Sequence, residues 1–282
     1  MRDMMKVPQN IKAIISVANV AAGVGKTTIS VNLAVELAVR GHRTLLIDAD
    51  PQAHATRFFM TDEQIGWTLA DTLCPPRPGS RHNFARWDVF SPSRFDNLFV
   101  VPSNIRLATF EGMEASHVTD LESCLAKIER SYEFVVIDTP SSLALLTQAC
   151  LYASTHVFAP VSPSGQGQAG WRLLSEYIGE MPCGARPAFL GILCNRFNCE
   201  SCQSGACYEA LKEEWGEALC GTIIHGDNLI ERCGEQWQPI RLCAPDPSAA
   251  SLCSDLADEL TARLSLPEAQ SESWPLANHD VA

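Results

Sequence analysis

The 282-residue chain contains no apolar run long enough to cross a membrane, and it has few lysines, five in all. Its first ten residues, MRDMMKVPQN, lack the apolar core of a secretion signal, so we expect the protein to stay in the cytosol. The formal net charge is −12, and from residue 141 onward 7 Arg and Lys face 17 Asp and Glu. Because nucleic-acid phosphates are bound by clustered positive charge, this composition argues against a broad DNA-binding face and leaves only a small local patch open.

Cysteine is abundant, with twelve residues. In the absence of a secretion signal, their number favours reduced thiols over a disulfide framework, and a metal site among them is an open alternative. Four cysteines lie in the stretch CNRFNCESCQSGAC, whose spacing fits no standard metal signature well. Because Cys194 belongs to a predicted strand, the candidate ligands for Zn²⁺ or an Fe–S cluster are Cys199, Cys202 and Cys207, with Cys183 or Cys233 as a fourth. The other interpretation is a cysteine-rich loop with free thiols.

Short apolar stretches alternate with segments of helical periodicity along most of the chain. The first unit is a strand at 11–18, a glycine-containing loop, a helix at 27–40 and a strand at 44–47, which implies a parallel sheet. Further strands are expected at 98–102, 134–137, 156–161, 188–194 and 222–224, and further helices at 120–130, 143–153, 168–179, 208–218 and 247–264. We therefore predict one α/β domain over residues 1–264, with a doubly wound, mostly parallel sheet and helices on both faces. We expect an exposed loop at 75–96 and a disordered acidic tail at 265–282.

The loop between the first strand and the first helix reads AAGVGKTT, residues 21–28. In a strand–loop–helix unit the backbone N–H groups of such a loop and the helix N-terminus face an anion, so the expected ligand is a phosphate group. Lys26 would reach the β- and γ-phosphates, and the Thr27 hydroxyl would bind Mg²⁺. The residues expected to contact the nucleotide in this loop are Gly23, Val24, Gly25, Lys26, Thr27 and Thr28. A standard phosphate loop has glycine at position 20, where this chain has Val20.

Taken in order, several segments resemble those of the ParA/MinD-type ATPases, whose deviant phosphate loop has the form KGGVGKTT. The matching segments are AAGVGKTT at 21–28, IDADPQA at 47–53, VPSNIRLA at 101–108, VIDTP at 136–140, CNR at 194–196 and IIHGD at 223–227. The resemblance spans residues 11–264 and implies a SIMIBI-type P-loop fold. It also implies Mg²⁺-dependent ATP hydrolysis, an ATP-dependent homodimer and a stimulating partner of the ParB type.

The resemblance also implies roles for single residues. Lys26 and Asp50 would be catalytic, with Asp50 placing the attacking water. Asp138 would hold Mg²⁺ through water together with Thr27, and Asn195 and Asp227 would contact the adenine. For Asp48, which also ends a predicted strand, two roles stay open: membership of the same metal network, or capping of a turn.

The chain departs from the family at Ala21, where the signature lysine would fall. In the family this lysine reaches the partner's phosphates in the ATP-bound dimer. Some carboxysome-positioning relatives also have alanine there and supply a lysine later, but residues 162–168 of this chain contain none, and Arg172 is the nearest cation. A positive group beside a transferring phosphoryl group contributes about 10³–10⁵ in rate. We therefore expect intact ATP binding with weak intrinsic hydrolysis.

Three functions follow as alternatives. The first is a ParA-like ATPase that positions a plasmid, a chromosome region or a protein assembly, and the second is a nucleotide-gated scaffold with little or no hydrolysis. The third is a metal-handling or Fe–S ATPase that uses the cysteines of residues 194–207. A membrane-cycling role is disfavoured, because Trp274 and Leu276 lie among acidic residues. Arg232 and Arg241 are the candidates for DNA contact.

Overall fold

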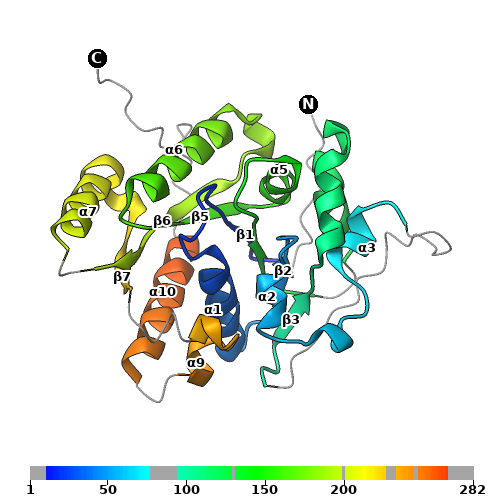
Figure 1. Cartoon of the computed structure of the whole chain (residues 1–282), viewed down its shortest axis with the longest axis horizontal. Coiled ribbons are helices and arrows are strands. Elements are labelled where there is room, and N and C mark those ends of the chain that lie inside the picture. Colours follow the sequence, from blue (N-terminus) through cyan, green and yellow to red (C-terminus); the bar gives the residue numbers. More distant parts are fainter. Residues whose placement is uncertain are drawn as a thin grey trace.

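A single seven-stranded parallel sheet forms the centre of the protein, in the order β3-β2-β4-β1-β5-β6-β7 (Figure 1). The computed structural model describes residues 11–76, 94–128, 131–198, 201–226, 233–243 and 247–265. The strands are β1 (Ala13–Val17), β2 (Thr44–Asp48), β3 (Leu98–Val101), β4 (Phe134–Asp138), β5 (His156–Val161), β6 (Ala188–Phe197) and β7 (Leu219–His225). Every residue of β1, β2 and β4 is buried, which explains why these strands are continuous apolar runs in the sequence.

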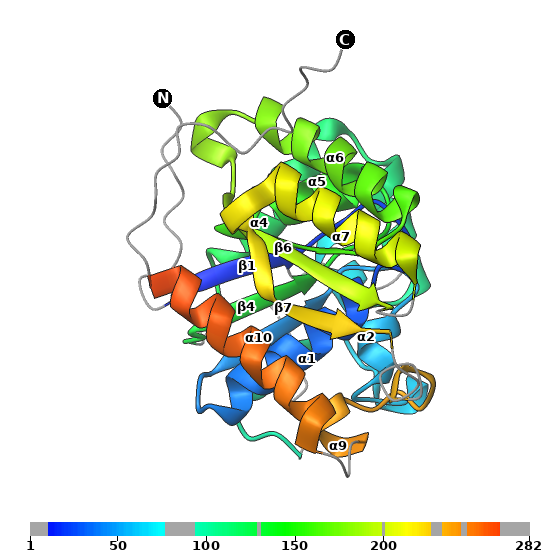
Figure 2. The ribbon, with the colours of Figure 1, turned by 90° about the vertical axis from the view of Figure 1, so that its left-hand side faces the viewer.

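Helices cover both faces of this sheet, as the sequence predicted. They are α1 (Lys26–Val39), α2 (His54–Arg57), α3 (Leu69–Leu73), α4 (Asp120–Leu125), α5 (Leu145–Tyr152), α6 (Gly165–Glu180), α7 (Cys202–Trp215), α9 (Ile240–Cys243) and α10 (Pro247–Ser265). Figure 2 shows α4, α5, α6 and α7 on one side, with α1, α9 and α10 on the other. The fold is therefore a doubly wound P-loop architecture. No helix in the described ranges is both long and apolar enough to traverse a bilayer.

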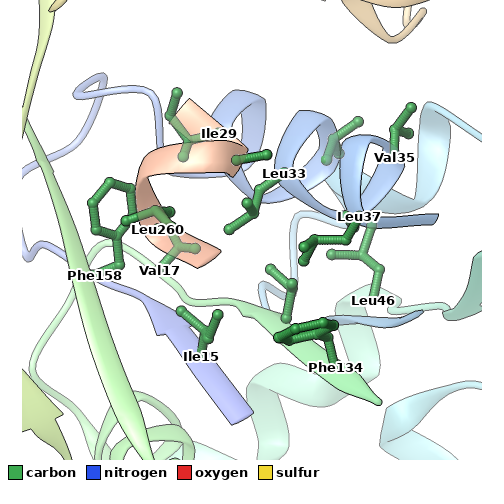
Figure 3. Packing of buried hydrophobic residues seen from close by; sticks show 14 of the residues in the cluster. Ile15, Val17, Ile29, Leu33, Val35, Leu37, Leu46, Phe134, Phe158 and Leu260 are labelled. Carbon is green, nitrogen blue, oxygen red and sulfur yellow. The ribbon is translucent and has the colours of Figure 1, made fainter. Parts of the chain in front are cut away.

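Helix α1 is buried on nearly all sides rather than along one stripe. Its Leu33 and Leu37 lie in the same apolar cluster as Phe134 and Phe158 of the sheet, and Leu260 of α10 joins them (Figure 3). Burying side chains of this size stabilises the fold by about 1.5–3 kcal/mol each. This packing fixes the helix whose first residue is Lys26.

Some predicted boundaries were wrong. The helix expected at 120–130 ends at Leu125, and the one expected at 208–218 begins at Cys202, so Cys202 and Cys207 lie on α7 rather than in a loop. Strand β6 continues to Phe197, which places Asn195 within the strand. Most of the loop expected at 75–96 and all of residues 266–282 lie outside the described residues, while Ser265 ends α10.

Candidate functional site

The phosphate loop connects the end of β1 with Lys26, the first residue of α1, at the carboxyl edge of the sheet. Gly23 and Gly25 have φ values of 73° and 94°, in the left-handed region that glycine adopts without strain. Asn19 fixes the start of the loop, because its amide nitrogen donates to Pro160 O at 3.0 Å and its Oδ1 accepts from Ala21 N at 2.9 Å. The segment AAGVGKTT therefore connects a strand and a helix, as the sequence predicted, and its binding of phosphate stays a prediction.

Lys26 folds back across this loop. Its Nζ donates to the Ala21 carbonyl at 2.9 Å and to Ser141 Oγ at 2.7 Å, and the residue is 6% exposed. Burial lowers the pKa of the Lys26 ammonium to about 8, against the opposing effects of the Asp138 and Asp50 carboxylates. The lysine is therefore close to both carboxylates that the sequence assigned to this site.

Asp48 and Asp138 are fully buried and lie opposite each other at the ends of neighbouring strands. Asp138 Oδ1 accepts from Ser30 Oγ at 3.0 Å, while Asp138 Oδ2 is buried with no hydrogen-bond partner among the described residues. Burial and the neighbouring Asp48 raise the pKa of Asp138 to about 8, although the Thr27 and Ser30 hydroxyls oppose this shift. A buried carboxylate oxygen without a partner, beside a threonine hydroxyl, fits a hydrated Mg²⁺, because this ion prefers oxygen ligands.

Both carboxylate oxygens of Asp48 accept hydrogen bonds from the segment 50–56. Its Oδ2 accepts from Thr56 N at 2.8 Å and Thr56 Oγ1 at 2.6 Å, and its Oδ1 accepts from Asp50 N at 3.1 Å. Burial raises the pKa of Asp48 to about 7, against the effect of these hydrogen bonds. Of the two roles left open by the sequence, this geometry favours the turn cap, which holds both ends of the segment 50–56.

Asn195 lies against the phosphate loop. It is 4% exposed, and its Nδ2 donates to Val24 O at 2.7 Å. A Cβ atom on Gly25 would lie 2.1 Å from this Nδ2, so the contact requires glycine at that position. The sequence predicted an adenine contact for Asn195, and that contact stays a prediction. Asp227, its predicted companion, lies outside the described residues.

The predicted cysteine site is not assembled in the part of the chain that the structure describes. Cys199 and the side chain of Cys202 lie outside it, and Cys207 is half-buried on α7. No group of three or more His, Cys, Asp or Glu residues able to hold a metal ion occurs among the described residues. A Zn²⁺ or Fe–S site at Cys199, Cys202 and Cys207 therefore remains a prediction from spacing alone.

Three arginines singled out in the sequence have different outcomes. Arg172 of α6 forms an ion pair with Glu214 of α7, which is the structural role of a surface arginine. Arg241 of α9 binds the buried Glu36 with two hydrogen bonds of 2.9 Å. Arg241 is therefore held in an ion pair within the fold, and a contact between Arg241 and DNA stays a prediction. Arg232 lies outside the described residues.

Sequence reasoning missed the hydroxyl groups that complete the site. Ser141 contacts Lys26 from the loop after β4, and Ser30 contacts Asp138 from α1. Ser30 stands three residues after Thr27, so the two share a helix face, and that spacing was a usable signal. The role of Ser141 had no such signal, because it depends on where the loop after β4 passes.

Comparisons with known proteins identify the family of the chain. A domain-family profile described as "AAA domain" matches residues 12–187, well over half of the chain. The cell division protein PomZ of Myxococcus xanthus is 29% identical over 252 residues, which cover 87% of this chain and 77% of PomZ. The sporulation initiation inhibitor protein Soj of Bacillus subtilis is 28% identical over 255 residues, 88% of this chain and 98% of Soj.

Solved structures show the same fold. The ATP complex of Cyanothece McdA(D38A) superposes with a TM-score of 0.77 at 19% identity, and the alignment covers 90% of this chain and 98% of McdA. The cell division ATPase MinD of Pyrococcus furiosus superposes with a TM-score of 0.71 at 21% identity and covers 89% and 99% of the two chains. With the phosphate loop of residues 21–28 and the paired strand-end carboxylates in place, the chain belongs to the AAA-domain family of ParA/MinD-type P-loop ATPases.

Proposed function

We propose that this protein is a Mg²⁺-dependent ATPase that dimerises on binding ATP and positions a cargo in the cytosol. The cargo would be a plasmid, a chromosome region or a protein assembly. The observation that supports this most directly is Asp138 Oδ2, which is buried beside Thr27 and has no hydrogen-bond partner among the residues that the structure describes. It adjoins a loop in which Gly23 and Gly25 are left-handed. A buried carboxylate oxygen that accepts no hydrogen bond is costly unless it meets a cation, and here a phosphate-binding loop adjoins it.

Each residue of the site would have a defined task. Backbone N–H groups of residues 23–28 would bind the phosphates, and Lys26 would exchange its bonds to Ala21 O and Ser141 Oγ for phosphate oxygens. Thr27 and Asp138 would hold Mg²⁺, which would offset the charge on the phosphate oxygens. Asp50 would orient the attacking water. The hydrogen bond from the Asp50 N–H to Asp48 would hold Asp50 in place.

A nucleotide-gated scaffold is the second candidate, favoured by the uncharged Ala21. Lys26 and Arg196 are the cations that contact the phosphate loop among the described residues, and Arg172 is engaged by Glu214. In this alternative the protein would bind ATP and hydrolyse little or none of it, whereas in the first proposal a ParB-like partner would stimulate a slow intrinsic hydrolysis. The two candidates differ in turnover, not in ATP binding.

The test measures ATP turnover together with molar mass by light scattering, for the natural chain, Ala21→Lys and Ala21→Met. Methionine gives a side chain of comparable length without charge. If the proposal holds, the natural chain doubles its mass with ATP and hydrolyses it slowly, and only lysine raises turnover, by about tenfold or more. A natural chain that binds ATP but neither dimerises nor hydrolyses it, with no gain from lysine, would refute the proposal and favour the scaffold.

A further inference from the structure

Arg196 occupies an unusual place at the end of β6. Its φ is 61°, in the left-handed region that few non-glycine residues adopt. The pairing of β6 with β7 is irregular here, because the register shifts between Asn195 and Phe197. Such bulges redirect a side chain, and backbone strain of this kind collects at ligand-binding sites.

The redirected side chain reaches the phosphate loop. Arg196 Nη1 donates to Gly23 O at 3.1 Å, and the neighbouring Asn195 Nδ2 donates to Val24 O at 2.7 Å. Two consecutive residues of β6 therefore hold two consecutive carbonyls of the loop. Because the carbonyl and N–H of a trans peptide point in opposite directions, holding these carbonyls outward turns the N–H groups of Val24 and Gly25 the other way, toward the expected phosphates.

The charge of Arg196 also matters at this place. Three acidic groups, Asp48, Asp50 and Asp138, influence one another electrostatically at the site, and Lys26 interacts with Asp138 and Asp50. A bound nucleoside triphosphate would add several negative charges to this site. A guanidinium stays charged at every physiological pH, so Arg196 brings lasting positive charge to the loop that would bind those phosphates.

We infer that Arg196 is a positioning residue for the phosphate loop and a second source of positive charge for nucleotide binding. Its bond to Gly23 holds the loop in the form that binds an anion, and its guanidinium raises the affinity for the polyphosphate. The strained backbone of the β6 bulge is what aims it there. This inference rests on the proposed ATP binding.

The test uses the full chain with Arg196→Gln, Arg196→Lys and Arg196→Gly, with Mg²⁺–ATP affinity from calorimetric titration and Tm for each. Arg43→Gln is the control for the loss of an exposed guanidinium away from the phosphate loop. Arg43 donates to the Ser131 carbonyl at 2.9 Å and lies over the rings of Phe99 and Tyr132. We expect glutamine to weaken ATP binding about tenfold and lysine to retain it within about threefold, since a charged donor is stronger than a neutral one. Arg43→Gln should leave the affinity unchanged.

The glycine variant separates a functional role from a structural one. Arg196→Gly relieves the left-handed strain, so its Tm should equal or exceed that of the natural chain while its ATP affinity falls as in Arg196→Gln. A parallel loss of Tm and affinity would overturn the inference, as would an Arg196→Gln variant that binds ATP like the natural chain. Failure of the natural chain to bind ATP would overturn the proposed function itself, and the inference with it.

Discussion

Replacing Glu36 should destabilise the protein more than any surface substitution, because its carboxylate is a buried junction of three helices. The Glu36 side chain is 2% exposed on α1, and it accepts from Arg241 Nε at 2.9 Å and Nη2 at 2.9 Å and from Arg40 Nη1 at 2.9 Å. Arg40 also donates to Ser254 O of α10 at 2.8 Å. The cluster ties α1, and with it the phosphate loop, to α9 and α10.

The expected loss of unfolding free energy follows from how deeply the Glu36 carboxylate is buried. Breaking a buried ion pair costs about 3–5 kcal/mol when the remaining charge stays buried. In Glu36→Ala the remaining groups are Arg40 and Arg241, which are 22% and 39% exposed and can partly rehydrate, so we expect about 3 kcal/mol. Arg241→Ala removes both bonds from Arg241 but leaves Glu36 its bond to Arg40, so it should cost about 2 kcal/mol, within the range for hydrogen bonds to a charged group. For a chain of this size, a loss of about 3 kcal/mol lowers Tm by about 6–12 °C.

Urea unfolding of both single variants and of the double variant measures these values and the coupling between the two residues, expected at about 1–2 kcal/mol. Lys12→Ala is the control, because Lys12 pairs with Glu133 at 2.6 Å but is 55% exposed, and its loss should cost under about 0.5 kcal/mol. An Arg241→Ala variant that unfolds like the natural chain, shows no coupling to Glu36 and loses DNA binding would refute this reasoning and make Arg241 a DNA contact.

Two further outcomes can be checked on the nucleotide site. Gly25→Ala should abolish ATP binding in calorimetry, because at a φ of 94° its Cβ would lie 2.1 Å from Asn195 Nδ2. Gly41→Ala is the control, because Gly41 has a φ of 90° but open space around it. This control should lose about 1–2 kcal/mol of stability and keep its ATP affinity. Burial raises the pKa values of Asp48 and Asp138 to about 7 and about 8, so the folded chain keeps protons that the unfolded chain releases near pH 4. Without nucleotide or Mg²⁺, the free energy of unfolding should therefore fall as pH rises from about 4 through these pKa values, as measured by urea titrations. If Asp138→Asn leaves the slope of the free energy of unfolding against pH unchanged, this cause is contradicted.

The element order was readable because each strand is a short apolar run bounded by turn residues. Thr44–Asp48 and Phe134–Asp138 were placed within one residue of their observed limits. The errors fell where local signals are weak. Strand β6 extends past Cys194 because its pairing with β7 continues, which its own residues do not reveal. The short α2 and α9 were not predicted, since elements of four residues depend on tertiary contacts such as that of Trp237 with Phe58.

The roles of the site residues also fall into those that the sequence indicates and those that depend on tertiary contacts. Lys26, Thr27 and Asp138 were assigned from contiguous motifs, in which a residue's place relative to a strand end or a helix start indicates its chemistry. The tasks of Asp48 and Arg196 were not readable, because each depends on which group lies opposite. Asp48 caps the segment 50–56 through its hydrogen bonds to Thr56 and Asp50, and its membership of the metal network stays a prediction.

The sequence by itself determined the fold class, the phosphate loop and the residues available for nucleotide chemistry, since hydrophobic periodicity and glycine positions act over a few neighbouring residues. Only the tertiary structure decided which of these residues meet. It placed Asn195 and Arg196 on the loop some 170 positions away in sequence and buried Glu36 under two arginines. It also left one oxygen of Asp138 with no hydrogen-bond partner in the part of the chain that the structure describes. Those contacts arise from the packing of a parallel sheet, which gathers the carboxyl ends of distant strands at one edge.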